Sequence, residues 1–121
     1  MRAEELGEMR DRNELYREHF EERQREFLKA LVTSELIEEH RRSPLGQHSE
    51  ALERLLIYFR RQPQLSKYAV VAVEPSRAYR IVLLSGRRGA PPRIVDDAVY
   101  GSPIEAYHGV FLRRIQDLLE S

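Results

Sequence analysis

Residues 68–84 read YAVVAVEPSRAYRIVLL, and this stretch decides the fold class. Two runs rich in β-branched and aromatic residues, 68–73 and 78–84, flank the sequence Glu74-Pro75-Ser76-Arg77. Such a pattern is typical of an antiparallel hairpin, in which Pro75 fixes φ at the first corner of a type I turn. Apolar residues occupy both faces of each run, so we expect both faces of the hairpin to be covered.

A short third strand is expected beyond the hairpin. The glycine- and proline-rich segment 86–92 predicts a loop, and the apolar residues of Ile94-Val95 and Ala98-Val99-Tyr100 follow it. The sheet is therefore either a hairpin or a three-stranded meander.

Ser102-Pro103-Ile104-Glu105 is the strongest local signal for a helix start. It combines a serine N-cap, a proline at the first helical position and a glutamate at the third. The helix is predicted from Pro103 to about Glu120. Its expected apolar face is wider than a single packing stripe. The residues of that face are Ile104, Tyr107, Phe111, Leu112, Ile115, Leu118 and Leu119.

The first predicted helix lies near the N-terminus. Asp11 and Glu14 form a capping-box pattern, which predicts a helix from Asp11 to about Val32. Residues 1–10 contain few apolar anchors and are interpreted as a frayed helix or a flexible arm. The apolar stripe of this helix comprises Leu15, Tyr16, Phe20, Phe27, Leu28 and Leu31.

Two shorter helices are predicted before the hairpin. One follows a break at Thr33-Ser34 and carries Leu36, Ile37 and His40. The other begins near Ser49 and is stopped by Pro63. We therefore predict one α+β domain over residues 1–121, with N-terminal helices, an antiparallel β-hairpin or three-stranded meander, and a C-terminal amphipathic helix.

The composition excludes several classes of protein. The 20 basic and 20 acidic residues cancel, so the chain lacks the positive field that non-specific nucleic-acid binding needs. It has no cysteine, which excludes disulfides and thiolate chemistry. No apolar run approaches the ~20 residues of a membrane span, and the N-terminus is too acidic for a signal peptide. We expect a cytoplasmic protein that binds neither nucleic acid nor membrane.

The histidines are the natural candidates for metal binding or acid–base chemistry. Glu105 and His108 have the spacing of a Glu-x-x-His turn, but di-iron bundles use such turns in pairs, and Glu105 already belongs to the capping box. A partly buried histidine is the better interpretation of His108. The four histidines are His19, His40, His48 and His108.

Other enzyme signals are weak. Asp96-Asp97 is interpreted as a solvated loop or cap, because adjacent side chains point apart. No serine lies in a G-x-S-x-G elbow. We therefore expect no catalytic, cofactor-binding or metal-binding residue in this chain.

Aromatic residues beside arginine pairs are the candidate partner interface, because aromatic residues and arginine dominate interface energetics. For the pair at 60 and 61, an alternative is simple complementation of a helix C-terminus. The candidate interface residues are Tyr58, Arg60, Arg61, Arg113 and Arg114.

Several strings in a fixed order carry a family resemblance. YFRRQPQLSKY at 58–68 precedes the Glu-Pro turn, AYRI at 78–81, a glycine loop, and EAYHGVFLRRIQDL at 105–118. The passage from EEH to SPLG at 38–46 also agrees. Over roughly residues 16–119 the chain resembles the small (alpha) subunit of N,N-dimethylformamidase.

This resemblance implies a non-catalytic small subunit attached to a large catalytic amidohydrolase subunit, with two or more copies of each chain. In that family the large subunit holds a mononuclear iron bound by tyrosine and glutamate side chains, and it hydrolyses the amide to dimethylamine and formate. One alternative is a free-standing interaction or regulatory protein with the same fold. Another is a small metal-dependent enzyme that uses the histidines.

Overall fold

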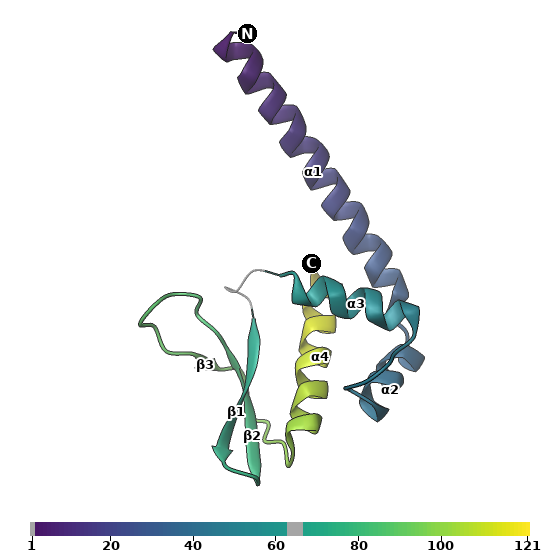
Figure 1. The fold of residues 1–121 in the computed structure, drawn as a ribbon, viewed down its shortest axis with the longest axis vertical. Coiled ribbons are helices and arrows are strands. Elements are labelled where there is room, and N and C mark those ends of the chain that lie inside the picture. The colour runs from purple at the N-terminus through teal and green to yellow at the C-terminus, as the bar shows by residue number, and fades with distance from the viewer. Residues whose placement is uncertain (1, 63–66) are drawn as a thin grey trace.

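The computed structural model describes residues 2–62 and 67–121, which form helices on one side of a small antiparallel sheet (Figure 1). The predicted α+β fold is confirmed, and the sheet has three strands in the order β1-β2-β3. The elements are α1 (Ala3–Leu31), α2 (Ser34–Arg42), α3 (Glu50–Arg60), β1 (Tyr68–Glu74), β2 (Ala78–Leu83), β3 (Arg93–Ile94) and α4 (Pro103–Glu120).

Helix α1 begins at Ala3, so the predicted start at Asp11 is wrong. Asp11 and Glu14 lie inside the helix, because the residues before them are mostly strong helix formers and Glu4 and Glu5 favour a helix N-terminus. Figure 1 shows most of α1 projecting away from the rest of the molecule. The expected apolar stripe therefore contributes little to the core, and Leu28 is its buried member.

The other helices begin where the sequence predicts. The Thr33 hydroxyl accepts a hydrogen bond from Leu36 N at 3.1 Å, and Ser49 caps α3 in the same way. At α4, Ser102 Oγ accepts from Glu105 N at 3.2 Å. The predicted stop at Pro63 lies outside the described residues, and α3 itself ends at Arg60.

Helix α4 packs on both the helices and the sheet (Figure 1). Phe111, Ile115 and Leu118 enter the helical core, while Ala106 and Gly109 are buried on other sides of α4. Four residues of the expected apolar face are instead exposed, namely Ile104, Tyr107, Leu112 and Leu119. The core residues are Leu28, Leu36, Leu52, Leu55, Phe59, Phe111, Ile115 and Leu118.

The hairpin forms as predicted, but its turn is not of type I. Arg77 N donates to Glu74 O at 3.0 Å, and Ser76 has a φ of 65°. A type I turn has φ near −90° at this position, whereas a positive φ is typical of type II. Pro75 is compatible with both types, so the sequence did not distinguish them.

One face of the sheet lies against α4 and the other is partly open. The Tyr68 hydroxyl donates to the Asp117 carboxylate of α4, so the face that carries Tyr68 lies against this helix. The pairing register places Val71, Val82 and Ile94 on the opposite face, where Val82 is buried but Val71 is 37% and Ile94 51% exposed. Val73 is 59% exposed and lies at the irregularity between Ala72 and Glu74. Both faces of the hairpin were expected to be covered, and this chain leaves part of one face uncovered.

The β3 edge of the sheet ends close to α4. Tyr100 pairs with Tyr79 through two backbone hydrogen bonds of 2.9 Å, so the second apolar segment of the predicted third strand forms a single bridge. A Cβ built at Gly109 of α4 would lie 2.5 Å from Tyr100 Oη and 2.6 Å from Cζ. This close approach requires a residue without a side chain at position 109.

We expect Gly109→Ala to lower the free energy of unfolding by about 1–2 kcal/mol, because the clash with Tyr100 outweighs the gain in helix propensity. In a Tyr100→Ala background the same change should instead be stabilising by up to about 1 kcal/mol. Urea denaturation of the four proteins of this cycle measures both effects. Equal effects of Gly109→Ala in the two backgrounds would contradict the contact.

Candidate functional site

Four of the five candidate interface residues gather around the C-terminal end of α3. Tyr58 and Arg61 line a groove between α1 and α3, and Arg60 and Arg114 line a smaller hollow between α3 and α4. Arg113 lies on another side of α4. Adjacent helical residues point about 100° apart, so the pair at 113 and 114 reaches two different elements.

Arg113 and Arg114 both make contacts within the chain. Arg114 Nη1 donates to Phe59 O at 2.8 Å, and its guanidinium carbon lies 5.9 Å from the centre of the Phe59 ring. Burial lowers the pKa of Arg114 from its usual value. The Arg113 guanidinium donates to the Asp96 carboxylate and lowers the pKa of that group.

Through these contacts the two arginines connect α4 to other elements of the same chain. Arg114 satisfies a carbonyl in the last turn of α3, and Arg113 ties α4 to the loop after β3. Asp96 also accepts from Ala98 N at 2.9 Å, so it caps this loop as the sequence suggested, and Asp97 is exposed. A role of the five residues in partner binding stays a prediction, and Arg60 and Arg61 are its exposed members.

A second cluster joins α2 and α4 through two histidines. His40 Nδ1 lies 2.9 Å from His108 Nδ1, so one ring donates and the other accepts. The His40 ring stacks on Phe111 with 3.9 Å between the ring centres and 11° between the ring planes. His40 is only 4% exposed.

Burial lowers the pKa of His40 from 6.5 to about 4, and His108 and His48 reinforce this shift. Burial also lowers the pKa of His108, with Arg41 as the next cause. Both rings are therefore neutral at pH 7. A neutral pair with opposite tautomers forms a hydrogen bond inside the core without a buried charge.

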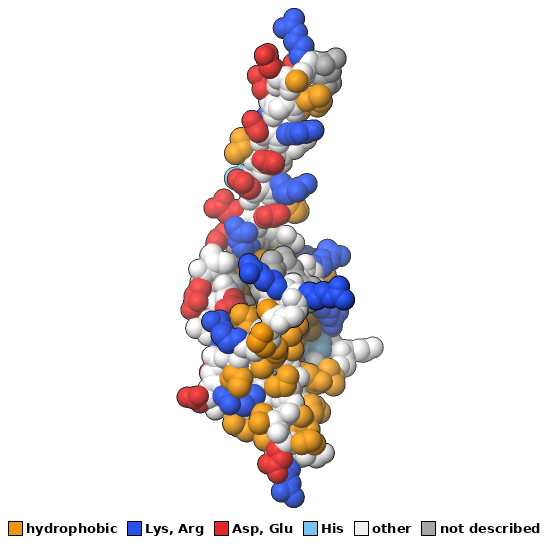
Figure 2. All heavy atoms as spheres, turned by 90° about the vertical axis from the view of Figure 1, so that its left-hand side faces the viewer, with side chains coloured by type: hydrophobic (Ala, Val, Ile, Leu, Met, Phe, Trp, Pro, Cys, Tyr) orange, Lys and Arg blue, Asp and Glu red, His pale blue; other side chains and the backbone are white. Residues whose placement is uncertain are grey.

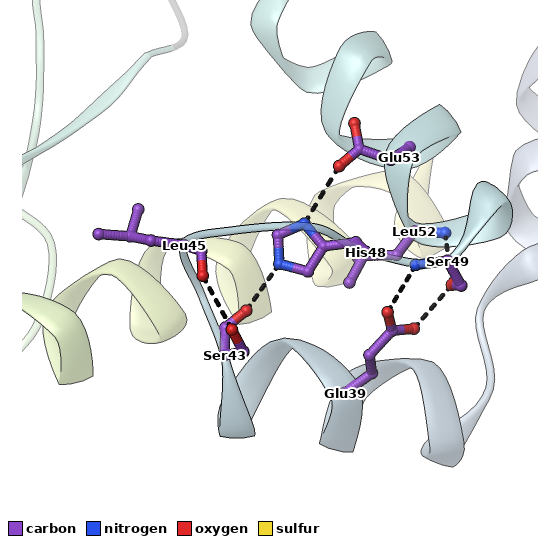
Figure 3. Close-up of polar contacts among 7 residues, drawn as sticks. All are labelled: Glu39, Ser43, Leu45, His48, Ser49, Leu52 and Glu53. Atoms are coloured by element: carbon purple, nitrogen blue, oxygen red, sulfur yellow. Dashed lines mark hydrogen bonds and ion pairs between the residues drawn. The ribbon is translucent and has the colours of Figure 1, made fainter.

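The loop between α2 and α3 is held by polar contacts on either side of His48 (Figure 3). His48 Nε2 donates to Ser43 O at 2.6 Å, and His48 Nδ1 lies 3.2 Å from Glu53 Oε1. The Glu39 carboxylate accepts from Ser49 N and Ser49 Oγ, both at 2.7 Å. These two hydrogen bonds lower the pKa of Glu39, and they fix the start of α3.

The contacts of the histidine cluster join α2 to α4 and stabilise the fold. Among residues 2–62 and 67–121, no three His, Asp or Glu side chains are arranged to hold a metal ion. The partial burial predicted for His108 is confirmed, and His19 lies on the exposed part of α1. The pairing of His40 with His108 was missed. The signal for burial was that Leu36 precedes His40 by one helical turn.

Exposed apolar side chains gather on two further surfaces. Figure 2, which views the molecule from the side of the sheet, shows hydrophobic side chains over its lower part and a group of basic side chains near the base of α1. The first surface is the partly open face of the sheet, with Val71 and Ile94, together with Val73 at the neighbouring irregularity of β1. The second is the projecting part of α1. No helix within the described ranges is long and apolar enough to cross a membrane.

Comparison with known proteins gives one consistent result. The family model described as N,N-dimethylformamidase alpha subunit matches residues 15–121. A protein of Paracoccus aminophilus named N,N-dimethylformamidase alpha subunit is 35% identical over 113 residues, which cover 89% of this chain and 79% of that protein. A protein of the same name from Alcaligenes sp is 34% identical over 114 residues, covering 90% of this chain and 85% of the relative. This chain therefore belongs to the N,N-dimethylformamidase alpha subunit family.

Proposed function

We propose that this chain is the small, non-catalytic subunit of an N,N-dimethylformamidase-like amidohydrolase. Hydrolysis of a small N-substituted amide to an amine and a carboxylate then takes place in a larger partner subunit. The curated relatives are named alpha subunits, and such a name belongs to an enzyme with further subunits. The cytoplasmic complex would contain two or more copies of each chain, with its iron in the large subunit.

The open face of the sheet is the observation that carries this proposal. Val71 and Ile94 share this face and are exposed, and the exposed Val73 lies at the neighbouring irregularity of β1, whereas Ile81 on the opposite face is buried. Contiguous exposed apolar side chains on a soluble protein mark interaction sites. A larger chain packed on this face would supply the cover that the sequence led us to expect.

The test is co-purification of the chain with the large subunit, followed by an amidase assay of the complex. We expect Val71→Glu with Ile94→Glu to weaken association by roughly 30-fold or more, because each carboxylate would be desolvated in the interface. Arg77→Glu, in the exposed hairpin turn, is the charge control and should leave the complex intact. Circular dichroism of each variant alone establishes that the fold is retained.

A second arm tests the candidate interface arginines. Arg60→Ala with Arg61→Ala should weaken association at little cost in stability, because both side chains are exposed. Arg113→Ala with Arg114→Ala should also lower the melting temperature, since both make contacts within the chain. Full complex and activity in all of these variants would show that neither surface holds the large subunit. A parent chain that does not co-purify with the large subunit would favour the alternative of a free-standing interaction module.

A further inference from the structure

Helix α1 carries a stripe of apolar side chains along its projecting part. Positions 6, 9, 13, 16, 20, 23, 27 and 30 alternate in spacing by three and four residues, as the seam of a coiled coil does. Six of these eight positions are apolar, and the exceptions are Asn13 and Arg23. Phe20, in the middle of the stripe, is 65% exposed. The apolar members are Leu6, Met9, Tyr16, Phe20, Phe27 and Ala30.

The stripe continues into the groove between α1 and α3. Phe20 and Phe27 form its α1 side, and Ile57 and Tyr58 form its α3 side. The groove has a volume of about 780 Å³. The Arg54 guanidinium carbon lies 5.7 Å from the centre of the Phe27 ring, so a positive charge lies next to the apolar residues of the groove.

The charges of the groove and of the helix tip are opposite in sign. Arg25, Arg54 and Arg61 line the groove together with one carboxylate, that of Glu21, which gives a net charge of +2. The segment 3–16, in contrast, contains five acidic and two basic residues, a net charge of −3. The N-terminal half of α1 therefore has both the apolar residues and the negative charge that complement the apolar, positively charged groove.

We propose that α1 pairs in antiparallel orientation with α1 of a second copy of this chain. The two-fold axis crosses the helices between Tyr16 and Phe20, and the N-terminal half of each helix lies along the groove of the other copy. Phe20 then packs on Tyr16 of the second copy, and Phe27 packs on its Met9. The overlap of residues 6–30 gives a contact roughly 36 Å long.

The register matches the stripe layer by layer. With Phe20 opposite Tyr16, the two polar positions also meet, because Asn13 lies opposite Arg23 of the second copy. On the flank of this seam, Arg12 lies close to Glu26 of the second copy. A polar layer set among apolar layers fixes the register of a coiled coil, and flanking charges fix its orientation.

Charge also favours the antiparallel orientation over the parallel one. In a parallel pair the two acidic N-terminal halves would lie side by side, and so would the two arginine-lined grooves. In the antiparallel pair each acidic half meets a basic groove. This pairing uses α1 and α3 and leaves the open face of the sheet to the large subunit, so it does not depend on the proposed function.

Disulfide cross-linking tests the orientation directly, because the chain contains no native cysteine. Asn13→Cys and Arg23→Cys proteins are purified separately as full chains, mixed, and oxidised. We expect a disulfide between positions 13 and 23 in the mixture and none in either protein alone. Cross-linking of either protein alone would indicate a parallel pair, and no cross-linking in the mixture would also overturn the proposal. Glu22→Cys, on the opposite side of α1, replaces Arg23→Cys as the control and should not cross-link.

Sedimentation of the chain without any large subunit measures the affinity. Phe20→Ser with Phe27→Ser should raise the dimer dissociation constant by roughly 30-fold or more. Leu15→Ser is the matched control, because Leu15 is also 65% exposed but lies off the stripe, and it should leave the constant unchanged. Arg12→Glu should weaken the dimer and Glu26→Arg in the same chain should restore it. A parent chain that is monomeric yet binds the large subunit would refute this pairing and leave the proposed function standing.

Discussion

Phe111→Ala will lower the free energy of unfolding by about 3–5 kcal/mol, which makes it the most damaging core truncation we expect in this chain. Phe111 is 2% exposed and belongs to the core formed by all four helices. Its ring stacks on His40 and meets the edge of the Phe59 ring, with 6.1 Å between the ring centres of the two phenylalanines. Truncation would leave a cavity between α2, α3 and α4 that rigid helices cannot close.

Urea denaturation followed by circular dichroism measures this loss, and an unchanged m-value would show that the lower midpoint reflects a loss of stability. Leu112→Ala is the control, because Leu112 is the next residue of α4 but is 41% exposed. It should change the stability by less than about 1 kcal/mol. If the two variants unfold at the same urea concentration, Phe111 is not the centre of the core.

The second large effect is a loss of stability in mild acid caused by His40. Its pKa is about 4 in the folded protein, against 6.5 for an unperturbed histidine. The unfolded chain therefore binds a proton at a higher pH than the folded chain does. The stabilisation is complete above pH 6.5 and is lost as the pH falls toward 4.

The size of this effect follows from the shift. Each pKa unit corresponds to about 1.4 kcal/mol, so His40 alone should remove about 3 kcal/mol of stability between pH 6.5 and 4. His108 shifts in the same direction and adds to the slope. The groups that face His40 are His108 from α4, His48 from the α2–α3 loop and Glu39 from α2, and the two histidines strengthen the shift while Glu39 opposes it.

Urea midpoints between pH 4 and 7.5 test this slope. His40→Asn places an amide near the former Nδ1 position without a titrating ring, so its stability should depend much less on pH in this window. His19→Asn, on the exposed part of α1, should keep the pH dependence of the parent. A parent protein whose stability is constant from pH 6.5 to 4.5 would show that His40 is not a buried neutral ring.

Local sequence signals determined most element boundaries. Ser102-Pro103 and Glu105 placed the start of α4 correctly, because an N-cap, an N1 proline and a third-position glutamate satisfy backbone groups within one turn. The β-branched runs likewise placed β1 and β2. The same local reasoning failed at Asp11, since a capping pattern inside a run of strong helix formers does not stop the helix.

The sequence by itself thus determined the fold class, the order of the elements and the absence of a cysteine framework. Only the tertiary structure decided which apolar faces are used, because a periodic stripe records amphipathicity but not the element that covers it. It left the stripe of α1 and part of one face of the sheet exposed, and it brought His40 to His108 from 68 positions away. It also turned Arg113 and Arg114 toward partners in two different elements, because contacts distant in the sequence depend on how the helices pack.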